Sequence, residues 1–253
     1  MTKFNNANKE EVGQAWQYKI RKAAAESETD QYWKNLDLDL KKAVIKPVPL
    51  SLAKTLIEKY EWLGTMAAIN KYAYGIFFQD VCGGVVVFGP EYSENLGVWD
   101  KYGFTGKILL LNRGVCLHWT PINTASKLIS GAIKLLPKKY EVITATTDHL
   151  AGEVGTIYQA CNFYYVGSMR DHNEKLKGKN RFGVVINNKL YGSRAMRTMV
   201  GSQKKQDILL KYPDAIFVKQ KPKHRYFYFR NNQKIHKSAI ESIILPYIKR
   251  KGA

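Results

Sequence analysis

The clearest alternation of apolar and polar positions lies between residues 107 and 167. Residues 107–111 form a continuous apolar run, typical of a buried strand, and residues 125–136 carry apolar side chains at helical spacing. A strand over 142–147, a short helix from about Glu153 to Ala160 and a strand over 163–167 follow. This order predicts an α/β unit whose functional groups lie at the carboxyl ends of parallel strands.

The flanking segments have weaker patterns. Residues 50–61 are predicted to form a helix, and residues 72–79 and 83–89 a β-hairpin. Beyond residue 170 the predicted elements are a hairpin of 181–185 and 187–191, a basic helical stretch over 194–211, strands over 216–219 and 225–230, and a helix over 240–248. We therefore expect a partly helical N-terminal arm (1–48), an α/β core (49–170) and a C-terminal segment of strands and helices (171–253).

The composition is that of a protein with a substantial core. Apolar residues make up 45% of the 253 residues and aromatic residues 12%, which argues against general disorder. The sequence contains no apolar stretch long enough to cross a bilayer and no apolar segment near the N-terminus typical of a secretory signal, so we expect a protein of the cytoplasm with no membrane partner. Cys82, Cys116 and Cys161 lack paired spacing, which favours free thiols over a zinc site.

The net charge of +19 is concentrated in the last third of the chain. Residues 170–253 contain 21 basic and 5 acidic residues, whereas residues 1–169 contain 19 and 16. Such a segment repels itself unless a polyanion neutralises it, so nucleic acid is the expected partner. The alternative is a basic face that only maintains solubility. The candidate phosphate contacts are Arg194, Arg197, Lys204, Lys205, Lys223 and Arg225.

Three polar side chains of the α/β unit are candidates for chemistry. Arg113 directly follows a predicted buried strand, where an arginine needs an anion, and Asp148 follows the next strand. The two could serve a substrate or only pair with one another. Tyr158 lies in the following helix, where its phenol could protonate a leaving group or could simply pack.

The start of the helix at 124–136 is a candidate site for an anionic donor group. Asn123 and Thr124 are suited to cap this helix, and Ser126 in its first turn adds a hydroxyl. A donor placed there would meet unpaired backbone N–H groups and the positive end of the helix dipole. The alternative is that Asn123 and Thr124 only cap the helix and that Ser126 is solvated.

Several strings of the sequence resemble the Mom family of phage proteins. They are Leu111-Asn-Arg113, Trp119-Thr-Pro-Ile-Asn-Thr-Ala-Ser126, Thr147-Asp148, Gly155-Thr-Ile-Tyr158-Gln-Ala-Cys-Asn162-Phe-Tyr-Tyr-Val-Gly167 and Lys223-His-Arg-Tyr-Phe-Tyr-Phe229. The resemblance implies a GNAT-like acyltransferase fold, a mixed twisted sheet flanked by helices with a basic C-terminal extension. It also implies that Arg113, Ser126, Asp148 and Tyr158 are the essential residues.

Members of this family modify the N6 amine of adenine in DNA with a small acyl-derived group and thereby protect the DNA from host restriction. The resemblance implies that activity here, with double-stranded DNA as the partner. Because the transfer needs close approach to the amine, we expect the target base to be flipped out of the duplex. Candidate stacking partners for the base are Trp62, Trp99, Trp119 and Tyr165. Two alternatives remain: a non-catalytic DNA-binding anti-restriction protein on the same scaffold, and an acyltransferase that acts on tRNA or protein.

The chain departs from related families at two places. Trp119–Ser126 stands where most GNAT enzymes carry the glycine-rich loop for CoA pyrophosphate. This departure argues against ordinary acetyl-CoA binding and favours another acyl or aminoacyl donor. Glu61-Trp62 replaces the upstream His-Tyr pair of the Mom family. The five histidines have no ligand spacing, so no metal site is predicted.

Overall fold

The structure, a computed structural model, divides the chain into two compact units. Unit 1 comprises residues 1–167 and 224–253, and unit 2 comprises residues 168–223. The residues described are 9–10, 15–91, 99–148, 151–168, 181–187, 189–220 and 222–250. Residues 224–253, which the sequence analysis placed with the basic segment, thus lie in the same unit as the α/β core.

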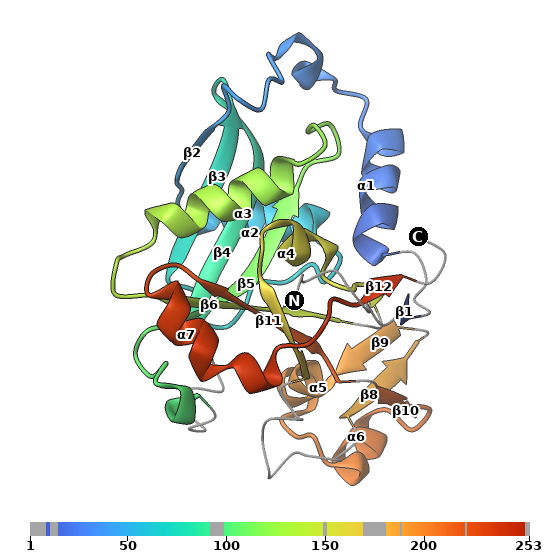
Figure 1. Cartoon of the computed structure of the whole chain (residues 1–253). Helices are drawn as coiled ribbons and strands as arrows, with labels where there is room; N and C mark the ends of the chain where they lie inside the picture. Colours follow the sequence, from blue (N-terminus) through green and yellow to red (C-terminus); the bar gives the residue numbers. More distant parts are fainter. Residues whose placement is uncertain are drawn as a thin grey trace. The chain divides into compact units, whose positions relative to one another are not determined.

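Unit 1 is built around a seven-stranded mixed sheet with the strand order β2-β3-β4-β5-β6-β11-β7 (Figure 1). The sheet strands are β2 (Val44–Pro47), β3 (Tyr72–Phe78), β4 (Val81–Pro90), β5 (Ile108–Cys116), β6 (Val142–Thr147), β7 (Tyr164–Ser168) and β11 (His224–Phe229). The helices are α1 (Trp16–Ser27), α2 (Leu50–Tyr60), α3 (Thr124–Leu135), α4 (Thr156–Ala160) and α7 (Gln233–Ala239). The predicted fold class, a mixed sheet flanked by helices, is confirmed.

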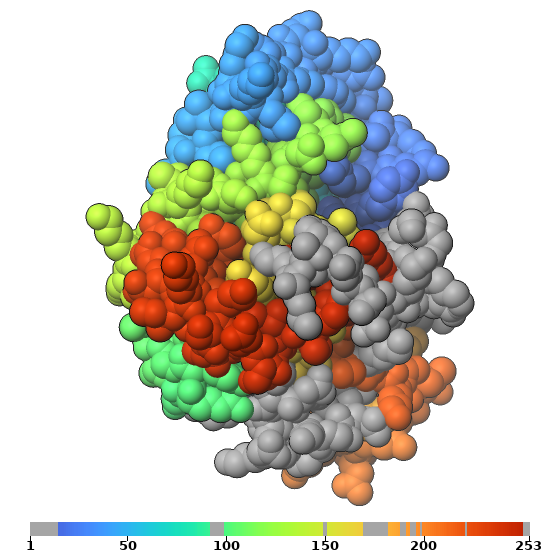
Figure 2. All heavy atoms as spheres, in the orientation of Figure 1, coloured from blue at the N-terminus to red at the C-terminus, as the bar shows by residue number. Residues whose placement is uncertain are grey.

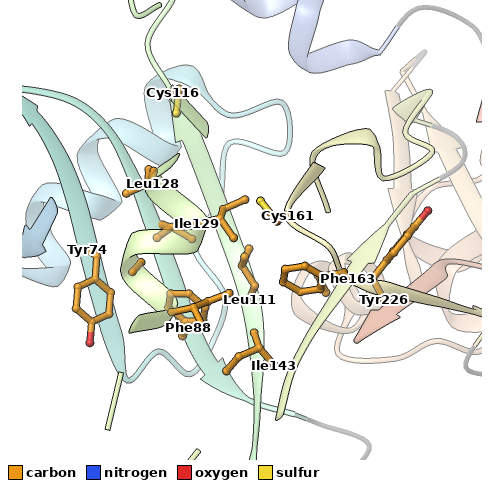
Figure 3. Close-up of a cluster of buried hydrophobic side chains, with 14 of the residues drawn as sticks. Tyr74, Phe88, Leu111, Cys116, Leu128, Ile129, Ile143, Cys161, Phe163 and Tyr226 are labelled. Carbon is orange, nitrogen blue, oxygen red and sulfur yellow. The ribbon is translucent and has the colours of Figure 1, made fainter. Parts of the chain in front are cut away.

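Helices α2 and α3 cover opposite faces of this sheet (Figure 1). Successive side chains of a strand point to opposite faces, so Val86 and Phe88 pack in the cluster that contains α3, whereas Val85 and Val87 pack beneath α2. Figure 3 shows the α3 side of the core, where Leu128 and Ile129 lie over Phe88 and Leu111. The two buried faces explain why β3 and β4 are apolar almost throughout.

Strands β5 and β6 pair over only part of their length. Their parallel pairing joins Ile108–Leu111 to Val142–Ala145, and β5 then continues to Cys116 alongside β4. A shift of register in β4 between Val87 and Phe88 accompanies the change. Because β5 and β6 are parallel, their carboxyl ends lie at the same edge of the sheet, and the strands separate before they reach it.

The remaining elements of unit 1 are short. Three 3-10 turns span Tyr32–Asn35, Asp100–Tyr102 and Glu241–Ile243, and β1 (Lys9–Glu10) pairs in parallel with β12 (Lys249–Arg250). The predicted helix over 240–248 is wrong, because α7 ends at Ala239 and only Glu241–Ile243 beyond it has helical geometry. Pro246 cannot supply the N–H that a continuing helix needs.

The N-terminal arm packs against the rest of unit 1. Arg21 of α1 donates to the carbonyl oxygens of Leu117 and His118 at 3.1 and 3.2 Å, and the amide of Gln17 bonds to Tyr60 O and Trp62 N–H at 2.8 and 3.0 Å. Farther along, Lys127 of α3 donates to the carbonyl oxygen of Leu40. Figure 2 shows this segment next to α3 on the surface.

Unit 2 has a small core of its own. Its sheet has the order β10-β8-β9, from β10 (Ile216–Gln220), β8 (Arg181–Ile186) and β9 (Lys189–Gly192). Helices α5 (Ser193–Val200) and α6 (Lys205–Lys211) are the other elements of unit 2. Helix α5 ends at Gly201, which has a positive φ. Val184, Ile186, Met196 and Ile208 are the buried apolar side chains of this core. The predicted strand over 216–219 therefore belongs to a different sheet from the strand at 225–230.

Gly155 at the start of α4 combines a left-handed backbone with a close aromatic neighbour. Its φ of +74° is in the left-handed region, and a Cβ there would lie 2.5 Å from the ring of Tyr226. We predict that Gly155→Ala lowers the free energy of unfolding by about 2–4 kcal/mol, from backbone strain plus overpacking, in urea denaturation. Gly103→Ala is the matched control, since Gly103 has a φ of +71° with nothing within 4 Å. An equal loss in both variants would contradict a role for the contact with Tyr226.

Candidate functional site

Charged and phenolic side chains from four segments of unit 1 interact electrostatically. Glu61 follows α2, Arg113 lies in the part of β5 that has left β6, Glu153 lies between β6 and α4, and Tyr158 lies in α4. The charges of Arg113 and Glu153 both act on the Glu61 carboxyl, and Glu61 and Glu153 both act on the Tyr158 phenol. We call these four residues the acid–arginine cluster.

Glu61 is the most unusual member because its carboxyl is buried. The residue is 9% exposed, and burial raises the pKa of Glu61 to about 7. The positive charge of Arg113 and the N–H of Leu63, which donates to Oε2 at 3.0 Å, oppose this rise, and the charge of Glu153 adds to it. Glu61 therefore exchanges a proton near neutral pH.

Arg113 is held in place by backbone oxygens. Its Nε donates to Thr65 O at 2.8 Å and its NH1 to Asn112 O at 2.7 Å. Thr65 lies in the loop that follows Glu61, so Arg113 ties this loop to β5. The fixed guanidinium is thereby presented to the buried carboxyl, where a charge has more effect than in water.

Asp148 is connected to the acid–arginine cluster through Glu153. The residue is 6% exposed, and its backbone N–H donates to Glu153 Oε2 at 3.2 Å while its carbonyl accepts from Glu153 N–H at 3.3 Å. Next to it, the hydroxyl of Thr147 is buried and has no hydrogen-bond partner among the described residues. The end of β6 thus carries polar groups that the fold buries.

The Tyr158 phenol is kept in its neutral form. Burial, followed by the charges of Glu153, Cys161 and Glu61, raises the pKa of Tyr158 well above its ordinary value. Its ring packs on Phe163 and Tyr226 with centroid distances of 5.4 and 5.6 Å. A neutral phenol that cannot easily ionise can donate a proton or hydrogen bond but is a poor base.

The start of α3 lies beside α4, although its predicted capping is wrong. Asn123 has a φ of +71° and makes no side-chain cap, and the hydroxyl of Thr124 donates to Pro121 O at 2.7 Å. The left-handed backbone turns the Asn123 side chain away from the helix N–H groups. The Ser126 hydroxyl donates to Asn123 O at 2.9 Å. The backbone carbonyl of Ser126 accepts from Cys161 Sγ at 3.6 Å, and Cys161 lies about one helical turn after Tyr158.

Most of the predicted phosphate contacts lie in unit 2. Arg197, Lys204 and Lys205 are exposed there and Lys223 is half-buried. Arg194 lies in α5.

Arg225 is not one of these surface cations, so its prediction as a phosphate contact is wrong. It lies in β11, is 5% exposed and pairs with the buried carboxylate of Glu91, which also accepts from the Thr144 hydroxyl. The central sheet buries Arg225 because β11 returns to pair with β6.

Three of the four predicted stacking aromatics are buried in unit 1. Trp99 packs edge-on to Phe227 and is fully buried, Trp119 is 9% exposed, and the hydroxyl of Tyr165 bonds to His224 Nδ1 at 3.0 Å. These three are wrong as partners for a base that enters from solvent. Trp62 is half-buried against Trp16.

Sequence reasoning did not select Glu61 or Glu153 as functional residues. Glu61 was noted only as a replacement at a family position, and Glu153 only as a helix start. A usable signal was present for Glu61: a carboxylate follows Tyr60 at the end of the apolar spacing of 50–60, next to Trp62. For Glu153 no signal in the sequence distinguishes it from a solvated loop carboxylate.

A surface pocket lies away from the acid–arginine cluster. It has a volume of about 300 Å³ and is lined by Asn162, Tyr164, Tyr228, Phe229 and Gln233. Phe229 pairs with Val142 at the start of β6, whereas Asp148 follows the end of β6. The Phe229 side of the pocket and Asp148 therefore lie at opposite ends of the strand.

The described residues offer neither a metal site nor a membrane-spanning helix. The described part of the chain contains no group of three His, Cys, Asp or Glu side chains placed to hold a metal ion. None of the helices that the structure describes is long and apolar enough to span a membrane.

The fold and the cluster define an α/β protein in which a guanidinium, a phenol and a buried carboxyl interact near the place where two parallel strands part. The chain belongs to the Mom protein family, which matches residues 42–249. No curated protein is significantly similar to it in sequence.

Two solved structures are similar in fold. An IAA acetyltransferase from Bacillus cereus ATCC 14579 is 12% identical with a TM-score of 0.37, covering 74% of this chain and 99% of its own. A Bacillus subtilis acetyltransferase in complex with CoA is 12% identical, with a TM-score of 0.35. The match covers 75% of this chain and 99% of the acetyltransferase.

The buried Glu61 carboxyl predicts a pH dependence of stability. Because the folded-state pKa of about 7 exceeds the ordinary value of 4.5, the unfolded chain ionises first as the pH rises. Wild-type stability should therefore fall between about pH 4.5 and 7 relative to Glu61→Gln, by up to about 3 kcal/mol. Urea unfolding at pH 4 to 8 measures this difference.

Glu58→Gln is the matched control, since Glu58 is an exposed carboxylate of the same helix paired with Lys54. If Glu58→Gln and Glu61→Gln change the pH profile alike, burial of Glu61 is not the cause.

Proposed function

We propose that the protein is a group transferase that adds a small acyl-derived group, carbamoylmethyl or acetamido-like, to the N6 amine of adenine in DNA and so protects the DNA from host restriction. Membership of the Mom family supports the reaction class. The observation that carries the proposal is the acid–arginine cluster, because transfer to an amine needs groups that remove and supply protons at one place.

The residues of the cluster and its neighbours have distinct roles in this reaction. The neutral phenol of Tyr158 protonates the leaving group, and Arg113 stabilises negative charge that develops on the donor carbonyl. Asp148 orients Glu153 through its backbone and lies where the adenine amine approaches. Ser126 positions the donor beside α4.

The donor is an activated acyl or aminoacyl ester, with acetyl-CoA as one candidate. The part of β5 that has left β6, residues 112–116, offers backbone polar groups beside the cluster. The first turn of α3 at Asn123, Thr124 and Ser126 supplies backbone N–H groups for an anionic part of the donor. No metal ligand set is assigned in this proposal.

Unit 2 is the proposed DNA-binding part. Residues 168–223 contain 14 basic and 4 acidic residues, a density of positive charge suited to phosphate. Contacts to phosphate position a duplex without selecting much sequence. The exposed side chains of Arg197, Lys204 and Lys205 are the leading contacts. Arg194, in the same helix as Arg197, and Lys223, at the end of unit 2, are the further candidates.

The contribution of Lys204 and Lys205 can be measured from salt dependence. If both contact phosphate, the double variant Lys204→Ala/Lys205→Ala reduces the slope of log K against log salt by about 1.8, because each contact releases about 0.9 counterion. Fluorescence anisotropy with a 20-base-pair duplex at several salt concentrations measures the slope.

Lys138→Ala/Lys139→Ala in unit 1 is the matched control. Lys138 and Lys139 are also adjacent and exposed, and Lys139 lies over Tyr140 at 5.1 Å as Lys205 lies over Phe217 at 5.3 Å. Equal changes in the two double variants would show only a general effect of net charge and would remove unit 2 as the DNA-binding part.

The role of Tyr158 predicts a variant that folds but does not modify DNA. Tyr158→Phe retains the ring packing but removes the proton, so modified adenine should fall by about 10²-fold or more. Mass spectrometry of nucleosides from DNA of expressing cells measures it. Tyr228→Phe is the control, since Tyr228 also packs on Phe163, at 5.3 Å.

The nucleoside measurement distinguishes three cases. A wild-type level of the adduct in Tyr158→Phe removes Tyr158 from the mechanism. Modified tRNA or protein in place of modified adenine would show a transferase with another acceptor, and no modification of any acceptor would favour a DNA-binding anti-restriction protein.

A further inference from the structure

We propose that helix α1 is a strap, releasable by acid, that joins two segments of unit 1: the end of α2 around Tyr60 and the segment after β5 around His118. This inference goes beyond the proposed function and does not depend on it, because α1 precedes residues 42–249, the part of the chain that matches the family. The observation behind it is that polar side chains of α1 and of Glu28 bridge both segments, although α1 buries none of its residues.

The first contact of the strap is with the end of α2. Oε1 of Glu28, the residue directly after α1, accepts from the Tyr60 hydroxyl and lies 3.4 Å from Lys59 Nζ. Near the other end of the helix, the Gln17 amide donates to Tyr60 O at 2.8 Å and accepts from Trp62 N–H at 3.0 Å. Helix α1 is therefore fixed to the end of α2 at both of its own ends.

The second contact is with the segment after β5. The Arg21 guanidinium donates to the backbone oxygens of Leu117 and His118 at 3.1 and 3.2 Å. Oε2 of Glu28 lies 3.8 Å from Nδ1 of His118, and Trp33, which carries no charge, meets the same ring edge-on at 4.9 Å. The Glu28 carboxylate thus directs one oxygen to each of the two segments.

Polar contacts, rather than burial of apolar surface, hold α1 in place. None of the residues of α1 is buried, whereas Trp33, Leu36, Leu38 and Leu40 farther along the arm pack against the main core cluster. A helix of 12 residues is only marginally stable by itself. Because few apolar contacts have to break, α1 can open locally while the later part of the arm stays docked.

The two segments that α1 joins lead to the acid–arginine cluster. The end of α2 continues into Glu61, and Leu117 follows β5, the strand that carries Arg113. Arg113 also donates to Thr65 O in the loop after α2. The strap is therefore a second tie between the same two segments, and its opening makes both of them more mobile.

Two titratable groups weaken the strap in acid. The His118 side chain is 7% exposed and neither ring nitrogen has a hydrogen-bond partner among the described residues, so its protonation in place is costly. Burial lowers the pKa of His118; the Glu28 carboxylate opposes this effect and the Arg21 guanidinium adds to it. Burial by itself would raise the pKa of Glu28, but the bonds from Tyr60 and Lys59 outweigh it, so that pKa lies below its ordinary value.

Both pKa shifts act in the same direction. A group whose pKa is lowered by docking stabilises the docked form above its ordinary pKa, and this stabilisation is lost as the pH falls through the lowered pKa. Docking of α1 is therefore strongest above about pH 6.5, the ordinary value for His118, and weakens below it. It weakens further below about pH 4.5, where Glu28 begins to be protonated.

Hydrogen–deuterium exchange of the full-length protein, read by mass spectrometry, tests the strap. In the wild type, peptides of α1 should exchange by local opening, faster than peptides of the buried helix α3. Glu28→Ala should speed the exchange of α1 and of segments 60–66 and 114–120 by about 10-fold or more, because hydrogen bonds to a charged group are lost. Glu26→Ala is the matched control, since Glu26 is an exposed carboxylate of α1 paired with Lys22 at 3.8 Å, and it should leave these segments unchanged.

The same measurement from pH 4.5 to 7.5, corrected for intrinsic exchange rates, tests the release by acid. Opening of α1 in the wild type should increase as the pH falls below about 6.5. His118→Gln has no imidazole to titrate, so the increase between about pH 5 and 6.5 should disappear. Circular dichroism shows whether each variant is folded at each pH.

The outcomes are distinct from those of the transfer reaction. Exchange of wild-type α1 as slow as that of α3 would overturn the releasable strap, and equal effects of Glu28→Ala and Glu26→Ala would remove Glu28 as its clamp. Opening that does not depend on pH, or that depends on it equally in His118→Gln, would overturn the release by acid. Each of these results leaves the proposed function as it stands, because nucleoside mass spectrometry tests that function separately.

Discussion

The partial pairing of β5 with β6 is the constraint on which the site depends. The two strands share backbone hydrogen bonds from Ile108 to Leu111, and beyond this point β5 stays with β4. Arg113 lies in the separated part, and Asp148 follows the end of β6. Continued pairing would close the edge at which these groups lie.

The parting of the strands also determines what must be buried. The segment between β6 and β7 carries α4 back over the sheet, which brings Glu153 and Tyr158 to the Arg113 side. The loop after α2 closes the other side, tied down by Arg113 at Thr65 O. The Glu61 carboxyl loses hydration in this place, so its pKa rises to about 7.

Arg225 and Arg113 show how one residue type serves two purposes in this fold. Arg225 is almost fully buried and paired with Glu91, so the fold neutralises it internally. Arg113 donates to two backbone oxygens, those of Thr65 and Asn112, which fix the direction of its guanidinium. A charge that the backbone orients can act on a neighbouring carboxyl.

The sequence by itself determined the local elements of unit 1. Apolar spacing gave α2, α3, the β3–β4 hairpin and β6 within a few residues, because burial of one helix face or of whole strands leaves a periodic record. It also placed Arg113, Asp148 and Tyr158 in order along one α/β unit. The helix expected over 240–248 failed because apolar spacing alone does not account for a proline at 246.

Only the tertiary structure decided which charges are buried and which carboxyl faces the arginine. Residues 216–219 and 225–230 look alike as strands, yet one pairs in a small separate sheet and the other in the central sheet, so Arg225 is buried while Lys204 stays exposed. Glu61 and Glu153 are 92 residues apart in the chain. Their interaction arises from strand order and loop closure, which depend on long-range pairing that no local pattern records.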